Sequence, residues 1–206
     1  DFCRGNPDEA DCVGLANRSP NCDADGPYAA ECAGEFTAVM LDGSASADLD
    51  QDPLTYEWSG PFQEGSAAGD APTVTFSGLG DFPLGLTVSD DLDGADMCES
   101  VATVVDTTPP VIECNSPETI APPDAPISFT ATAVDVCDGE LTPVVTGYDC
   151  WATNPAGKRV DKTDSCEVGF VGNQVSIFDA GGILTNIEWT VAVVDATGNV
   201  AETTCS

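Results

Sequence analysis

Short segments of alternating apolar and polar residues recur through most of the chain after residue 35. Phe36, Ala38 and Met40 fall two positions apart, which places their side chains on one face of a β-strand, and segment 54–58 repeats this pattern. Turn-forming residues separate such segments, as is typical of β-sandwiches built from short strands. The other strand-length segments are 73–76, 82–88, 98–105, 111–114, 127–134, 144–148, 175–178, 183–194 and 200–205.

Two prolines, Pro109 and Pro110, divide this pattern, because each removes a backbone donor and holds the chain extended. We place a domain boundary directly after Asp106. The sequence therefore predicts an all-β protein of two tandem sandwiches, residues 31–106 and 107–206. Residues 1–30 contain three cysteines without an alternating pattern, and we expect them to form a short disulfide-pinned N-terminal head.

Two groups of motifs resemble known extracellular modules. DGSASADLDQDPLTYEW (Asp42 to Trp58) and LTVSDDLDG (Leu86 to Gly94) are similar to the PKD domain, an immunoglobulin-like sandwich common in secreted microbial proteins. DTTPPVIEC (Asp106 to Cys114), ATAVDVCDG (Ala131 to Gly139) and WTVAVVDATGNVA (Trp189 to Ala201) resemble the HYR domain, another immunoglobulin-like module. The resemblance implies two tandem immunoglobulin-like sandwiches with structural, adhesive or spacer roles, and neither family is itself catalytic.

Charge and cysteine content restrict the setting and the partners of the chain. It carries 36 acidic and 5 basic residues, a formal charge of −31, which excludes a nucleic-acid binder that works through a basic face. Histidine is absent, which excludes histidine-dependent nucleophiles and histidine-ligated zinc. Ten cysteines favour a secreted protein in an oxidising setting, outside the cell or on its surface. No segment approaches the ~18 apolar residues that a membrane-spanning helix requires.

Aspartates gather in the expected loops of the first sandwich. In an immunoglobulin-like topology, the approach to the first strand, the B–C loop and the F–G loop share one end of the sandwich. Clustered carboxylates bind Ca²⁺ rather than softer metals, so we predict one or more calcium sites here, with solvated turn carboxylates as the alternative. The predicted ligands are Asp23, Asp25, Asp48, Asp50, Asp52, Asp90, Asp91 and Asp93.

The second sandwich repeats this layout in its linker, its B–C loop and its F–G loop. The predicted ligands are Asp106, Asp135, Asp138, Asp195 and Asn199. We expect a Ca²⁺ ion at the joint between the sandwiches. Glycoside hydrolysis needs a buried acid across a sugar-binding cleft, which solvated loop aspartates do not supply, so we expect no enzymatic activity.

The cysteines predict a set of disulfide bridges, although spacing alone does not fix their connectivity. The head and the second domain each keep one leftover cysteine. Either the head packs along the first domain, or its odd thiol bonds to another molecule. The expected bridges join Cys32 to Cys98 and Cys114 to Cys205, with one further local pair among Cys137, Cys150 and Cys166.

Lys158, Arg159 and Lys162, three of the five basic residues, lie in the loop between Cys150 and Cys166. A solvated hairpin tip is the simplest interpretation of such a loop. On so acidic a chain, the loop is also a natural docking point for the acidic pole of a neighbouring copy. A head-to-tail contact of this kind builds an open filament.

The sequence therefore predicts a calcium-stabilised subunit of an extracellular filament or surface layer. The alternative is an adhesin, or a polysaccharide-binding accessory module of a secreted hydrolase, with Trp151 as a sugar-stacking residue. A third interpretation makes the acidity an adaptation to high salt. Asn17-Arg18-Ser19 also matches an N-glycosylation sequon.

Overall fold

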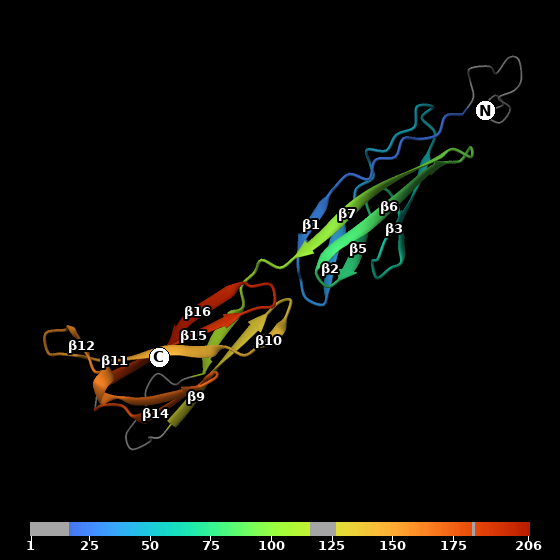
Figure 1. Cartoon of the computed structure of the whole chain (residues 1–206). Helices are drawn as coiled ribbons and strands as arrows, with labels where there is room; N and C mark the ends of the chain where they lie inside the picture. The colour runs from blue at the N-terminus through green and yellow to red at the C-terminus, as the bar shows by residue number, and fades with distance from the viewer. Residues whose placement is uncertain (1–16, 116–126, 183) are drawn as a thin grey trace, which may run out of the picture. The chain divides into compact units, whose positions relative to one another are not determined.

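The computed structural model describes residues 17–115, 127–182 and 184–206, and it divides the chain after Asp106 into two compact units. Apart from one turn of 3-10 helix at Thr163–Ser165, the regular elements are β-strands (Figure 1). The all-β fold class predicted from the sequence is confirmed. Cys3 and Cys12 of the predicted head lie outside the described residues. Within the described ranges, no helix is long and apolar enough to cross a membrane.

The first unit is a sandwich of two sheets. One sheet has the strand order β1-β7-β6-β3-β4, and β2 pairs with β5 in the other. β1 runs parallel to β7, whereas β6 is antiparallel to both of its neighbours. The strands are β1 (Tyr28–Glu31), β2 (Phe36–Met40), β3 (Leu54–Ser59), β4 (Ser66–Ala68), β5 (Thr73–Ser77), β6 (Gly80–Asp90) and β7 (Ala95–Val105).

Trp58 lies in the core of the first unit, fully buried with Phe76 and Leu86. It sits opposite Leu86 on β6, and its indole N–H donates to the carbonyl of Gly69 (3.1 Å), which satisfies its one polar group. This placement agrees with the period-two pattern of segment 54–58, which puts Trp58 on the inner face of the sheet.

The apolar residues of β2 predict that one face of the strand is buried, but the structure buries the other face. Thr37 and Val39 are buried, whereas Phe36 and Met40 are exposed. The register with β5 explains this orientation, because Thr37 pairs with the buried Phe76 and Val39 pairs with the buried Val74. A one-residue offset exchanges the two faces of a strand, so the partner strand decides which face is buried.

The second unit is also a sandwich of two sheets, with β11, β15 and β16 in one layer and β9 and β14 in the other (Figure 1). The first sheet has the order β12-β11-β15-β16, and the second has the order β10-β9-β14-β13 with β8 paired to β9. The strands are β8 (Val111–Asn115), β9 (Ile127–Asp135), β10 (Gly139–Leu141), β11 (Val144–Thr153), β12 (Arg159–Asp161), β13 (Glu167–Val171), β14 (Gln174–Asp179), β15 (Thr185–Val194) and β16 (Val200–Cys205).

Trp189 anchors the core of this second unit, where it packs with Phe129, Val175 and Val191. These residues come from β9, β14 and β15, so the cluster joins the two sheets. Full burial of each smaller partner, such as Val175 or Val191, stabilises a fold by roughly 1.5–3 kcal/mol relative to exposure.

Three disulfides lie within the units: Cys22–Cys98, Cys114–Cys205 and Cys150–Cys166. Cys98 therefore pairs with Cys22, and the expected Cys32–Cys98 bridge is wrong. Cys32 donates its backbone N–H to Val105, at the far end of β7. Seven residues of strand, roughly 23 Å, separate that end from Cys98, and disulfides require Cα atoms within about 7 Å.

No described cysteine is free. Cys32 and Cys137 are also disulfide-bonded. The Cys22 bridge and the pairing of β1 with β7 incorporate residues 22–31 into the first sandwich. The described part of the predicted head therefore belongs to that unit.

Removing the Cys114–Cys205 bridge should destabilise the second unit more than removing Cys150–Cys166. The bridged residues are 91 and 16 positions apart, and loop closure stabilises by about 3 kcal/mol for 15 residues and about 4.7 kcal/mol for 100. In urea titrations, we expect the Cys114→Ser, Cys205→Ser variant to lose ~1–2 kcal/mol more unfolding free energy than Cys150→Ser, Cys166→Ser. Equal losses would contradict this ranking.

Candidate functional site

The loop between β2 and β3 brings Asp48, Asp50 and Asp52 together, and we call these three the first-unit aspartate group. One carboxylate oxygen from each residue lies within 4.8 Å of the other two. Asp48 shapes the loop, because its Oδ1 accepts hydrogen bonds from the backbone N–H groups of Asp50 (2.6 Å) and Asp52 (3.4 Å). Three of the eight predicted ligands of this unit therefore do lie side by side.

Arg18 places a positive charge against this group, and the sequence analysis did not anticipate it. Its guanidinium donates from Nη2 (2.6 Å) and Nε (3.2 Å) to Asp50 Oδ1, and its backbone N–H donates to Asp50 Oδ2 (2.9 Å). The hydrogen bond with Asp50 is the main cause that raises the pKa of Arg18, and the charges of Asp50 and Asp48 act in the same direction. The first-unit aspartate group thus already has a cationic partner.

Asp90 ends β6 and caps the turn that leads to β7. Its buried Oδ1 accepts the backbone N–H groups of Leu92 (2.7 Å) and Gly94 (2.8 Å), and its Oδ2 accepts Nδ2 of Asn17 (3.0 Å). The Asn17 hydrogen bond is the main cause that lowers the pKa of Asp90, against the opposing effects of burial and the Asp50 charge. A Cβ at position 94 would lie 2.2 Å from Asp90 Oδ2, so this turn requires glycine.

The other predicted ligands of the first unit do not join the first-unit aspartate group. Asp91 and Asp93 are exposed in the β6–β7 turn. Asp23 Oδ1 accepts the backbone N–H of Asp25 (2.9 Å). Burial raises the pKa of Tyr28, and the charges of Asp25 and Asp23 add to this rise, which places both aspartates near the phenol.

Asp195 caps the corresponding turn of the second unit, between β15 and β16. Its Oδ1 accepts the backbone N–H groups of Thr197 (2.9 Å), Gly198 (2.7 Å) and Asn199 (2.8 Å), and its Oδ2 accepts Nδ2 of Asn199 (2.8 Å). Burial raises the pKa of Asp195, but the hydrogen bonds from Asn199, Thr197 and Gly198 outweigh burial and hold the pKa below its usual range. The amide of Asn199, a predicted metal ligand, is used in this turn.

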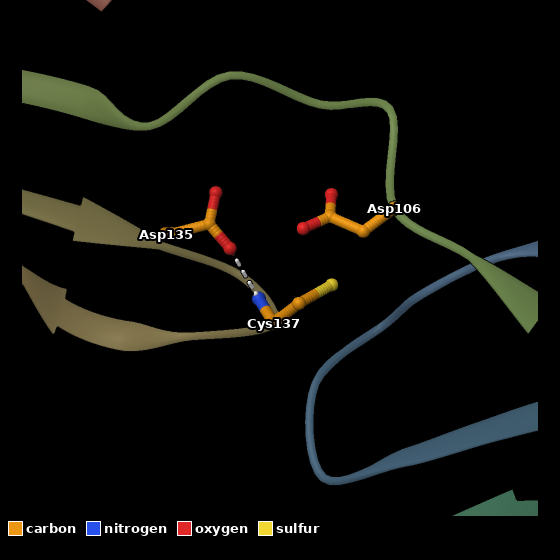
Figure 2. A group of neighbouring side chains, drawn as sticks. All are labelled: Asp106, Asp135 and Cys137. Carbon is orange, nitrogen blue, oxygen red and sulfur yellow. Dashed lines mark hydrogen bonds between the residues drawn. The ribbon is translucent and has the colours of Figure 1, made fainter. Parts of the chain in front are cut away.

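Three predicted ligands of the second unit lie in its turns: Asp135 and Asp138 at the β9–β10 turn, and Asp195 at the β15–β16 turn. Asp106 directly precedes the second unit. One carboxylate oxygen each from Asp106, Asp138 and Asp195 lie within 4.8 Å of one another, and so do oxygens of Asp106 and Asp135 with the sulfur of Cys137. The carboxylates of Asp106 and Asp135 point toward one another (Figure 2). Cys137 is disulfide-bonded and supplies no thiolate, so the possible ligands are all oxygens.

The β11–β12 hairpin holds Arg159 in place. Its guanidinium pairs with the carboxylates of Asp149 and Glu188 (3.3 Å for the latter) and lies over the ring of Trp151, 4.5 Å from the centroid. Arg159, predicted as part of a docking surface, is therefore already matched by two acidic side chains. Trp151 is partly buried, and Arg159 covers one face of its ring. Lys158 is exposed at the tip of the hairpin.

The sequon residue Asn17 uses its side chain inside the fold. Its Nδ2 donates to Asp90 Oδ2 (3.0 Å) and to the carbonyl of Leu92 (3.1 Å). A glycan attached to this nitrogen would have to break these hydrogen bonds, so glycosylation at Asn17 competes with the turn.

Comparison with known protein families gives one match, and it falls on the first unit. Residues 17–105 match the family model of the PKD domain. The matched range begins at Asn17 and so includes Arg18, the cationic partner of Asp50, as well as the disulfide partner Cys22. The HYR resemblance of the second unit stays a prediction. Comparison with curated proteins gives no match to the chain.

Several solved structures match the chain at low similarity. A nucleoside hydrolase-related hypothetical protein from Saccharophagus degradans is 22% identical, over 44% of this chain and 26% of its own, with a TM-score of 0.34. Carbohydrate-binding modules of the β-sandwich superfamily are 14% identical over 91% and 95%, with a TM-score of 0.36. SGBP-B from Bacteroides ovatus, in complex with a mixed-linkage heptasaccharide, is 11% identical over 90% and 46%, with a TM-score of 0.31. The chain thus spans about a quarter of the first structure, and likenesses this weak do not bear on what it binds.

Replacing Asn17 by alanine should reduce the stability of the first unit in a pH-dependent way. The pKa of Asp90 is lowered in the folded state, so this carboxylate stabilises the fold above its unfolded pKa of about 3.9 and loses that contribution as the pH falls through the folded value. We expect Asn17→Ala to raise the pKa of Asp90 in an NMR titration. The loss of unfolding free energy should be larger at pH 7 than below about pH 3.

The second unit supplies the control for this experiment, because its unfolding transition should not change in the Asn17→Ala variant. A loss of the same size at both pH values would show that the Asn17 contact with Asp90 does not depend on the carboxylate charge.

Proposed function

We propose that the chain is a non-enzymatic extracellular module with a structural or adhesive role. The observation that carries this proposal is the use of the loop carboxylates. Asp48, Asp90, Asp135 and Asp195 each hold the backbone N–H groups of their own loop. These aspartates are therefore part of the scaffold rather than acids and bases placed across a cleft. The disulfides and the PKD match over residues 17–105 support an extracellular setting.

Within this class, we propose that copies of the chain associate head to tail into a filament or layer. Lys158 and Lys162 are the basic residues of the hairpin that no described ion pair uses. The three residues of the adjoining strand β12 are exposed, and the strand lies at the edge of its sheet, where unpaired backbone groups are available to a neighbour. The chain has a formal charge of −31, so a second copy offers acidic surface that is complementary in charge to these lysines.

Sedimentation velocity and electron microscopy of the oxidised chain test this assembly. We expect polymers that grow with protein concentration and dissociate in about 1 M NaCl, where the screening length falls to about 3 Å. The Lys158→Glu, Lys162→Glu variant should stay monomeric, whereas the charge-preserving Lys158→Arg, Lys162→Arg variant should still assemble. A chain that is monomeric at every concentration would rule out the filament.

A polysaccharide pull-down separates assembly from the alternative of a sugar-binding module. Trp151 is the aromatic residue predicted for sugar stacking, and Arg159 already covers one face of its ring. We therefore expect no retention that depends on Trp151. Binding to a polysaccharide that is lost in Trp151→Ala, by a chain that stays monomeric, would identify an adhesin or an accessory module of a secreted hydrolase.

A further inference from the structure

Asp48 has one carboxylate oxygen that its own loop leaves unused. Its Oδ1 accepts the backbone N–H groups of Asp50 (2.6 Å) and Asp52 (3.4 Å) in the loop between β2 and β3. Its Oδ2 is shielded from solvent, and no described group donates a hydrogen bond to it. Burial of a charged oxygen without a partner is strongly unfavourable, so this atom requires a cation, a proton or an ordered water molecule.

Asn17 presents a second oxygen of this kind. Its Nδ2 donates to Asp90 Oδ2 (3.0 Å) and to the carbonyl of Leu92 (3.1 Å), and these two acceptors fix which end of the amide carries the nitrogen. The other end, Oδ1, is also shielded from solvent and receives no hydrogen bond from a described group. An amide oxygen is not protonated at ordinary pH, so a proton does not satisfy it. A cation satisfies both kinds of oxygen, because carboxylates and amide carbonyls are both ligands of hard metals.

Contacts within the first unit bring Asn17 to the first-unit aspartate group. The next residue, Arg18, donates its backbone N–H to Asp50 Oδ2 (2.9 Å). Asp90, which accepts the Asn17 amide, lies opposite Leu54 at the start of β3, just after the aspartate loop. All of these residues belong to one compact unit. The two unused oxygens therefore lie in the same region of that unit, although their residues are far apart in the sequence.

Arg18 neutralises only part of the charge in this region. Its guanidinium donates to Asp50 Oδ1 (2.6 Å from Nη2, 3.2 Å from Nε) and to the carbonyl of Leu49 (3.1 Å). None of these hydrogen bonds goes to Asp48, and the side chain of Arg18 is 55% exposed. Arg18 is the only basic residue in the sequence between positions 17 and 105. A water molecule would hydrogen-bond to the unused oxygens but would not neutralise the remaining carboxylates, whereas a cation does both.

We propose that a Ca²⁺ ion binds the first-unit aspartate group, with Asp48 Oδ2 as its buried carboxylate ligand and Asn17 Oδ1 as a neutral ligand. One carboxylate oxygen from each aspartate of the group lies within 4.8 Å of the others, and Ca²⁺–oxygen distances of about 2.3–2.6 Å place two ligands at most about 5 Å apart. The donors are all oxygens, which disfavours zinc and copper, and ligands from a loop suit the flexible coordination of Ca²⁺ better than the strict octahedron of Mg²⁺. This inference goes beyond the function proposed above and does not depend on assembly.

NMR and calorimetry of the full oxidised chain, freed of metal by EDTA and titrated with CaCl₂, test the site. Calcium should shift the backbone amide signals of residues 48–52 and of Asn17 and Arg18, which locates the ion in the first unit. Extracellular calcium modules bind with dissociation constants of about 10⁻⁴–10⁻³ M. At 10 mM CaCl₂, we therefore expect the melting temperature of the first unit to rise by roughly 5 °C or more.

Asp48→Asn provides the decisive variant. It keeps an oxygen for the backbone N–H groups of Asp50 and Asp52 but removes the buried charge. We expect it to melt at least as high as the wild type without calcium, and to show neither the calcium-dependent rise nor the amide shifts. A purely structural role for Asp48 predicts lower stability under both conditions with the calcium response retained. Asp52→Asn gives a second test if Asp48→Asn does not fold.

Asp91→Asn is the matched control, because Asp91 is exposed in the β6–β7 turn of the same unit and the substitution removes the same charge. This variant should respond to calcium like the wild type. The inference is overturned if the wild type shows no response at residues 48–52 or if Asp48→Asn responds fully. It is also overturned if Asp91→Asn loses the response, or if MgCl₂ gives the same shift at equal concentration, because either result would indicate general screening of charge.

Discussion

Hydrogen bonds from backbone N–H groups to aspartate carboxylates hold the loops on which both sandwiches depend. Asp90 and Asp195 close the turns between their long strand pairs in the same manner, and Asp48 and Asp135 order the loops beside them. A carboxylate accepts several donors at once without needing a cation, and charge makes each bond stronger than a neutral one. These aspartates are therefore part of the turn chemistry of the chain.

The strands could be predicted because their signal is local. Segment 54–58 alternates in the sequence and forms β3, and the strand-length segment 200–205 forms β16, both where expected. β2 shows the limit of this method, because its apolar residues indicate one buried face and its partner strand selects the other. The short strands β1, β4, β10 and β12 have only three or four residues, too few for a period to be visible, and pairing with longer neighbours defines them.

The candidate site was only partly readable from the sequence, because loop convergence depends on long-range pairing. The Asp48-Leu49-Asp50-Gln51-Asp52 run is visible as a cluster, and it folds as one. The contacts of Arg18 with this run and of Asn17 with Asp90 could not be predicted, because both residues precede the first regular strand in a segment without any periodic pattern. Arg18 is nevertheless the one basic residue between Arg4 and Lys158, which marks it as the available counter-charge for the first unit. Cys22 lies in the same segment, which runs along β7 and so brings Cys22 to its disulfide partner Cys98.

The Cys114–Cys205 bridge also determines how the second unit responds to a mechanical pull. It joins β8 to the last residue of β16, so force applied through the backbone on either side passes across the covalent bond instead of through the strands between them. The bridged cysteines are 91 positions apart, a length of roughly 300 Å when fully extended, and this part of the chain cannot be stretched while the bridge is intact. Only reduction of the bond would release this length, which makes the second unit an inextensible segment under tension in an oxidising environment.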